Sequence, residues 1–81
     1  MNQIKEYDLV AIDQNISAIH KETKQPILLR KGQVGTVIMD YDGKAFLIDF
    51  ADEKGITYAM ETVLVKNLIH LLYTPVALQA S

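Results

Sequence analysis

Cysteine is absent from this chain of 81 residues, and no apolar run is long. Without cysteine there is no disulfide framework, no thiolate nucleophile and no cysteine metal site. None of the apolar runs approaches the roughly 20 residues that span a bilayer. The amino terminus also lacks the basic-then-apolar pattern of a signal peptide, so we expect a cytoplasmic protein without a membrane partner.

Basic residues are few as well. Eight Lys and Arg stand against ten Asp and Glu, which gives a net charge of −2 and a pI of about 5.5. The only weak concentration of positive charge is at Lys21, Lys24, Arg30 and Lys31. Proteins that bind nucleic acid through its phosphates need a basic stripe, because counterion release supplies much of the affinity. We therefore expect no nucleic-acid partner.

Apolar side chains are what the chain has in excess. They make up 49% of the residues, and 29 of them are Val, Ile, Leu, Met or Phe. A chain of this length forms one domain, and a five-stranded barrel encloses only about 15–18 side chains. The surplus is expected to face outward, onto a partner, a second copy or a covering tail. The alternative is a set of scattered surface leucines, as on ordinary monomers.

The first half of the chain predicts one strand and a long loop. Tyr7–Ile12 is a short run rich in strand formers, closed by turn-prone polar residues. From Gln14 to Leu29 the sequence is mostly polar, and Pro26 disfavours helix at the residue before it. This connection is longer than a usual hairpin loop, and long loops in compact domains are often functional.

The middle of the chain predicts a three-stranded meander. Thr36–Tyr41 and Lys44–Phe50 flank Asp42-Gly43, which is a strong hairpin signal because both central residues of that turn need positive φ. A second turn at Asp52–Gly55 leads into a third strand, Ile56–Val63. The open edges of such a meander need closing, and a fifth strand that pairs with the first strand of the chain, Tyr7–Ile12, would close them.

The last apolar stretch fits two patterns. Val65, Leu68, Ile69 and Leu72 have the spacing of a helical stripe, whereas Ile69, Leu71 and Tyr73 alternate as in a strand. We favour one helical turn over Val65–Leu68 and then a strand over Ile69–Tyr73, because the barrel needs its fifth strand. Pro75 ends that strand.

These elements predict an all-β fold, a small five-stranded SH3-like barrel with a long first loop and one short helical turn before the last strand. The single domain occupies residues 1–81, with the barrel over about 6–73 and a tail over 74–81. Alternation along the strands places one set of side chains inside. The expected core residues are Val10, Val37, Met39, Phe46, Ile48, Phe50 and Leu68.

The segment Arg30–Ile38 contains Gly32-Gln33-Val34-Gly35-Thr36-Val37. With Asp42-Gly43 and the following strand, it resembles the Gly-x-x-Gly-x-Val signature of small SH3-like barrels. These include the KOW domains of ribosomal and transcription factors and the barrel subunits of cyanobacterial photosynthetic complexes. Many unrelated barrels share the motif, so it indicates a fold and not a function.

A second resemblance covers most of the chain. Tyr7–Ala11, Pro26–Val37 and Phe50–Asp52 together are similar to an uncharacterised bacterial family, the domain of unknown function numbered four-nine-two-six, common in cyanobacteria. The resemblance implies a short single-domain protein without an assigned activity. It also implies a gene beside another small gene, in an arrangement similar to toxin–antitoxin pairs. It supplies no catalytic residues.

Four groups of residues can be interpreted either as catalytic, metal or phosphate sites or as ordinary structural residues. His20 and His70, the only imidazoles, lie on a predicted loop and a predicted strand, far apart for a metal site. Ser17 lacks a nucleophile elbow, and Asp49, Asp52 and Glu53 lie beside a turn, where carboxylates are usually solvated. Gly32–Gly35 opens a strand and not a helix, unlike a P-loop. We predict no catalytic, cofactor or metal site, no small-molecule substrate and no enzymatic activity.

The surplus of apolar side chains favours a protein-interaction module. One form of this hypothesis is that the protein itself acts as an antitoxin-like or immunity-like partner of the product of a neighbouring gene. An accessory barrel subunit of a larger enzyme or photosynthetic complex is the first alternative, and a ribosome-associated or RNA-associated KOW-like domain is the second. The partner is expected to be another protein or a second copy. The candidate contact residues lie in the long loop and the tail: Ile27, Leu28, Leu29, Arg30, Tyr73, Val76 and Leu78.

Overall fold

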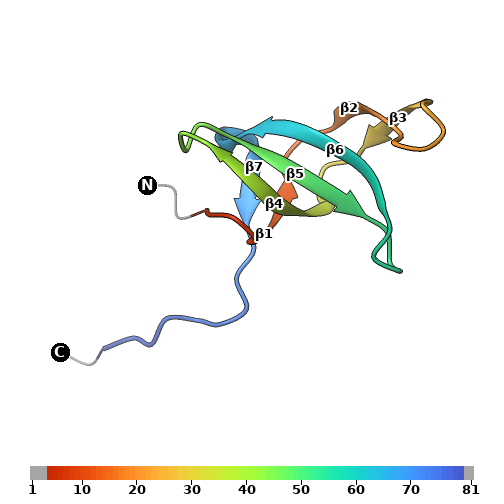
Figure 1. Cartoon of the computed structure of the whole chain (residues 1–81). Coiled ribbons are helices and arrows are strands. Elements are labelled where there is room, and N and C mark those ends of the chain that lie inside the picture. Colours follow the sequence, from red (N-terminus) through yellow and green to blue (C-terminus); the bar gives the residue numbers. More distant parts are fainter. Residues whose placement is uncertain (1–3, 80–81) are drawn as a thin grey trace.

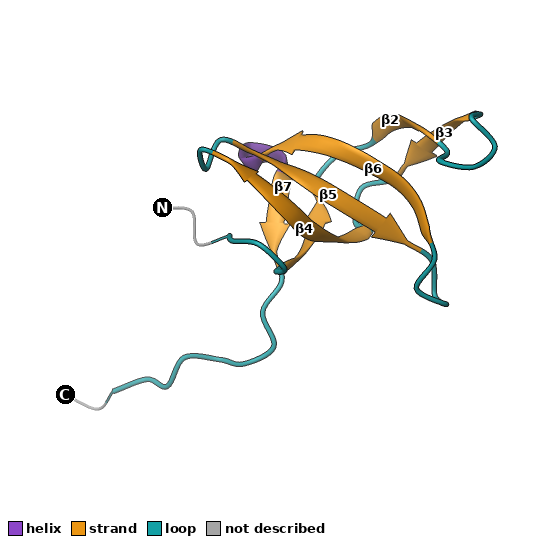
Figure 2. Ribbon diagram, in the orientation of Figure 1, coloured by secondary structure: helices purple, strands orange, loops and turns teal. Residues whose placement is uncertain are grey.

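The computed structural model describes residues 4–79, which form seven strands and one short 3₁₀ helix (Figures 1 and 2). Within this range no helix is long and apolar enough to cross a membrane. Met1–Gln3 and the last two residues of the predicted tail, Ala80 and Ser81, lie outside the described residues. The elements in chain order are β1 (Leu9–Ile12), β2 (Ile16–Ile19), β3 (Pro26–Leu29), β4 (Val34–Tyr41), β5 (Ala45–Ala51), β6 (Thr57–Leu64), η1 (Val65–Asn67) and β7 (Leu68–His70).

Five strands form one antiparallel sheet in the order β6-β5-β4-β1-β7. The prediction of an all-β fold is therefore confirmed, and so is the pairing of the last strand with the first, in which Val10 lies opposite His70. The helical turn before the last strand is also present, as η1. The sequence suggested that the last strand ends at Tyr73, but β7 ends at His70. Among the described residues no ladder joins β6 to β7, so these two strands are the edges of the sheet.

The core lies on the inner face of this sheet. Along β5 the side chains of Phe46, Ile48 and Phe50 are fully buried, and Val10 and Val37 join them from β1 and β4. These five predicted core residues are confirmed. Leu68 is only partly buried and packs against the edge of the cluster.

Met39 is not a core residue, contrary to prediction. The register of β4 against β5 shifts between Val37 and Met39: Val37 lies opposite the buried Ile48, but Met39 lies opposite Leu47. A β-bulge of this kind inserts one extra residue and so reverses which side chains face inward beyond it. Met39 therefore points outward and is 44% exposed.

Two glycines allow the meander to form. At the β4–β5 turn, Asp42 and Gly43 have φ of 57° and 70°, and the Lys44 N–H donates to the Tyr41 carbonyl over 3.2 Å. The predicted Asp-Gly turn is thus confirmed, with positive φ at both central residues. Gly35 is needed for a different reason, since a Cβ there would overlap Cγ2 of Ile48 and lie 3.0 Å from the Asp49 carbonyl oxygen.

The predicted long loop over Gln14–Leu29 is instead a β-hairpin, with β2 and β3 paired so that Ser17 lies opposite Leu28. The reason is an alternation of apolar residues that turn inward. Ala18 and Leu29 are buried, and Ile16 and Ile27 pack against the same cluster. The hairpin closes through the His20 N–H, which donates to the Gln25 carbonyl over 2.9 Å.

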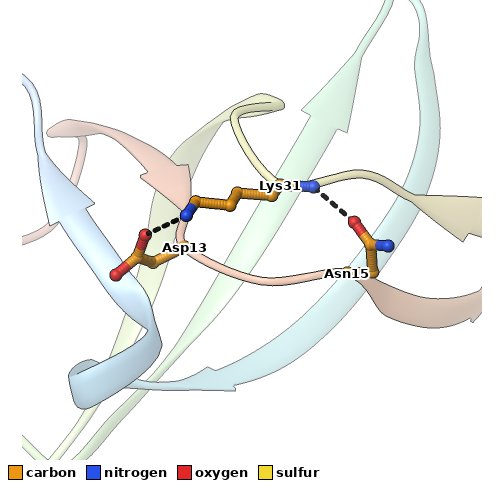
Figure 3. A network of polar contacts seen from close by, with 3 residues as sticks. All are labelled: Asp13, Asn15 and Lys31. Atoms are coloured by element: carbon orange, nitrogen blue, oxygen red, sulfur yellow. Dashed lines mark hydrogen bonds and ion pairs between the residues drawn. The ribbon is translucent and has the colours of Figure 1, made fainter.

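Polar contacts fix the base of this hairpin. Lys31, just after β3, donates its backbone N–H to Asn15 Oδ1 over 2.8 Å, and its Nζ lies 3.8 Å from Asp13 Oδ1 (Figure 3). The two charged side chains are largely exposed, so this ion pair contributes little by itself. The contact nevertheless links the chain entering β2 to the chain leaving β3.

The hairpin also lies against β6, one edge of the main sheet (Figure 1). The Lys21 N–H donates to the Tyr58 carbonyl over 2.7 Å, and the Ile19 N–H reaches Glu61 Oε2 over 3.4 Å. Gln33 Nε2 donates to the Tyr58 hydroxyl over 2.8 Å. The hairpin therefore covers part of an edge that would otherwise be open to pairing.

Candidate interaction surfaces

The hairpin residues proposed from the sequence divide between two faces. Leu29 is 1% exposed and belongs to the core. The prediction that it forms part of a contact surface is therefore wrong. Ile27 is half-buried and packs against the core from outside. Leu28, on the opposite face of the same strand, is 56% exposed, and Arg30 is exposed beside it. Of this group, only Leu28 and Arg30 are therefore exposed to a partner.

The tail residues are exposed. The Leu71 N–H donates to the Leu9 carbonyl over 3.1 Å, and beyond this point the chain leaves the sheet in an extended path (Figure 1). Tyr73, Val76 and Leu78 are 88%, 90% and 98% exposed. From Leu71 to Ser81 the sequence contains no charged residue. A solvated tail is usually rich in charge, so an uncharged apolar one is unusual.

The outer face of the main sheet is a further apolar surface, which the sequence interpretation missed. Because Phe46, Ile48 and Phe50 point inward, Ala45, Leu47 and Asp49 point outward. Residues directly opposite each other on neighbouring strands share a face. The rows across β4, β5 and β6 are Tyr41–Ala45–Leu64, Met39–Leu47–Thr62 and Thr36–Asp49–Met60. We call these nine residues the outer face.

The outer face carries almost no charge. Asp49 is its one ionisable acid, and Asp49 Oδ1 accepts a hydrogen bond from the Thr57 hydroxyl over 2.7 Å. At the β6 edge, a shallow hollow of about 290 Å³ lies between Met60 and the β2–β3 hairpin, where Ile19 is also exposed. Lys21, Lys24 and Glu61 also line this hollow, so charged side chains border the apolar surface on the side of the hairpin.

A groove of about 700 Å³ lies where the two ends of the fold meet. Asp8 and His70 line it, with His70 Nε2 3.0 Å from Asp8 Oδ2. Tyr7 and Tyr73 stand at its sides and are both highly exposed. Tyr7 has φ of 72°, a conformation that costs free energy in a residue other than glycine. Nothing in the sequence pattern links Asp8 to His70, because only the β1–β7 pairing brings them together.

The remaining polar candidates serve local structure. Nδ1 of His20 accepts hydrogen bonds from the N–H groups of Glu22 and Thr23, and its ring stacks on Tyr58 with centroids 6.4 Å apart. Asp52 Oδ1 accepts from the backbone N–H groups of Lys54 and Ile56 within the β5–β6 turn. In the part of the chain that the structure describes, no three acidic or histidine side chains gather where they could hold a metal ion.

The fold and these surfaces define an all-β domain with one five-stranded sheet, one hairpin and extended apolar surfaces. The chain belongs to the family described as "Domain of unknown function (DUF4926)", which matches residues 6–70. The family resemblance inferred from Tyr7–Ala11 and Pro26–Val37 is thereby confirmed. The match includes the hairpin and the outer face and ends at the last residue of β7, before the tail. No curated protein and no solved structure matches the chain.

Proposed function

We propose that the protein is a non-catalytic protein-interaction module that acts in the cytoplasm. The observation that carries the proposal is the distribution of large apolar side chains. Within residues 4–79, those that are exposed outnumber those that are buried. Apolar patches of this extent on a small domain usually mark sites of contact with another protein. Ordinary monomers leave single leucines exposed. Here four exposed large apolar residues lie on one face of the main sheet, and four more lie along an uncharged tail.

We further propose that the domain is an SH3-like barrel. The order of the strands supports this assignment, as do the long excursion between the first two sheet strands and the 3₁₀ turn before the last one. The excursion is the β2–β3 hairpin, which lies against β6 and covers part of that edge of the sheet. A rigid small barrel that presents loops and one sheet face is a scaffold well suited to binding.

The partner is a protein and not a nucleic acid or small molecule. We extend the proposal to the product of a neighbouring gene, bound in the manner of an antitoxin or immunity protein, as the resemblance of the sequence to its family implies. Docking as an accessory subunit onto a larger assembly is the same proposal with a different partner. In both forms, the exposed Leu28 and Arg30 on the hairpin and the tail make the contact.

The test is site-specific photo-crosslinking of the full chain in its native host. A photoreactive amino acid replaces Leu28 or Tyr73 in two variants, and Glu53 in the β5–β6 turn in a control. We expect discrete protein adducts from the first two positions and none from Glu53. Absence of adducts from both Leu28 and Tyr73, in variants that accumulate to the level of the wild type, would contradict the proposed function.

A further inference from the structure

Two apolar surfaces with little or no charge lie on the same chain without covering one another. One is the outer face, and the other is the tail beyond Leu71. We infer that they bind each other between two copies: the tail of each copy lies on the outer face of the other, in a symmetric dimer. This inference rests on the proposed function, since it names the first partner of a protein-interaction module.

The outer face is shaped to receive an extended segment. Three strands about 4.8 Å apart and seven or eight residues long present a surface of roughly 15 by 25 Å. Its middle row, Met39–Leu47–Thr62, is free of charge, and so is the neighbouring row, Tyr41–Ala45–Leu64. Met39, Tyr41 and Leu64 are each more than two-fifths exposed. Burying such side chains against another apolar surface stabilises a complex.

The tail matches this surface in length and in chemistry. Residues 72–79 in an extended path reach roughly 26 Å at about 3.3 Å per residue, which is the length of the strands beneath. Leu72, Val76 and Leu78 alternate with other residues along it, so an extended tail turns these three side chains to one side. The tail contains no charge that would have to be desolvated on an apolar surface.

The area favours a second copy over a different occupant. A stable dimer buries about 800 Å² on each partner, more than a face of this size supplies alone. When each copy contributes both a face and a tail, the two contacts occur together and the buried area rises to that range. A twofold dimer is a closed assembly, because each of the two tails binds one of the two outer faces and neither surface stays free for a further copy.

The path of the tail also favours a second copy. The tail starts beside β7, one edge of the sheet, whereas the outer face is centred on β5, separated from β7 by β4 and β1. Figure 1 shows the tail running away from β4, β5 and β6. It would have to reverse direction to cover the face of its own chain, but it meets the face of a neighbouring molecule without a turn.

The experiment is a sedimentation measurement of dimer dissociation with a complementation arm. The face variant is Leu64→Glu, and the tail variant carries Val76→Glu and Leu78→Glu. We expect the wild type to be a dimer and each variant to raise the dissociation constant about tenfold or more, because a buried unpaired carboxylate is costly. Mixing the two variants should give a heterodimer that is weaker than the wild-type dimer but tighter than either variant homodimer, because the intact tail of the face variant binds the intact face of the tail variant while the second contact stays disrupted.

Matched controls place the same charge elsewhere. Ile56→Glu alters an exposed apolar residue in the β5–β6 turn, outside the rows of the outer face. Gln79→Glu alters a polar residue of the tail that the alternation turns to the side opposite Val76 and Leu78, away from the outer face. Both controls should dimerise as the wild type does. Thermal unfolding confirms that each variant is folded, and Met60→Glu replaces Leu64→Glu if the latter is not.

Three results would overturn the inference: a monomeric wild type, a dimer unaffected by both variants, or variants that are each monomeric and do not complement. The first of these results, a monomeric wild type, includes a monomer in which the tail covers the outer face of its own chain. A monomeric wild type that still forms adducts with another protein from Leu28 or Tyr73 would leave the proposed function in place.

Discussion

At the residue scale, β5 carries both the core and the outer face. Its side chains alternate strictly, with Phe46, Ile48 and Phe50 buried and Ala45 and Leu47 turned outward. Both sets are largely apolar, and Asp49 is the one charged residue that marks the outward side of the strand. Substitutions at neighbouring positions should therefore have very different effects on folding.

The first prediction compares Phe46→Ala with Leu47→Ala. The ring of Phe46 is fully buried, so its removal leaves a cavity and should lower the free energy of unfolding by about 3–5 kcal/mol. Leu47 is half-buried on the other face, and its truncation should cost less than about half as much. Urea denaturation at low protein concentration measures both. Equal losses from the two substitutions would mean that the assigned strand facing is wrong.

The second prediction concerns Gly43. It has φ of 70° in the β4–β5 turn, and no atom would lie within 4 Å of an added Cβ. The cost of a side chain here is therefore backbone strain alone, and Gly43→Val should destabilise by roughly 1 kcal/mol or more. Gly43→Asn is the control and should cost less, since asparagine tolerates this conformation. An unchanged melting temperature in Gly43→Val would contradict the turn geometry.

At the element scale, the hairpin of β2 and β3 is the least expected part of the fold. Its sequence is mostly polar and contains Pro26, which pointed to an irregular loop. The structure uses the proline at the first position of β3, where a missing N–H is tolerated. Four apolar residues then alternate inward, two on each strand. This alternation was present in the sequence, but it is too short to stand out from a loop.

The third prediction tests this hairpin through Leu28 and Leu29. Leu29 is buried in the core, and Leu29→Ala should cost about 2–5 kcal/mol. Leu28 lies on the exposed face of the same strand, so Leu28→Ala should change stability by about 0.5 kcal/mol or less. Chemical denaturation of the two variants is sufficient. A larger loss from Leu28→Ala than from Leu29→Ala would show that the hairpin has the opposite facing.

Tight turns and strong alternation made the meander predictable. β4, β5 and β6 lie close to their expected bounds because Asp-Gly and the Asp52–Gly55 turn separate clear apolar runs. The bulge after Val37 was not predictable, since Val37, Ile38 and Met39 are all apolar and only the pairing with β5 reveals the extra residue. The burial of Leu29 likewise depends on packing between elements distant in sequence.

At the scale of the whole molecule, the described residues extend over 56 × 28 × 20 Å, and the tail accounts for part of the long dimension (Figure 1). The surplus of apolar residues indicated an exposed surface from composition alone. Its position was only partly predictable. The tail is exposed as expected, but the outer face depends on the register of three strands, which the sequence does not reveal.

The fourth prediction follows from the overall charge. With a net charge of −2 and dispersed basic residues, the protein should show no saturable binding to single-stranded RNA at physiological salt. Fluorescence anisotropy with a labelled oligonucleotide measures this, and a KOW domain of known RNA affinity serves as the positive control. Tight binding that weakens steeply with added salt would instead support a ribosome-associated function.

The central claim is that the exposed apolar surfaces are contact surfaces. The most direct measurement is a methyl NMR spectrum of the full chain, recorded on dilution from the millimolar to the micromolar range. We predict that the methyl signals of Met39, Met60 and Leu64 on the outer face shift together with those of Val76 and Leu78, and that Ile56 does not shift. When a captured partner is titrated into the sample, the methyl signals of Leu28, Val76 and Leu78 should shift. Methyl signals that stay constant in both experiments would contradict the account.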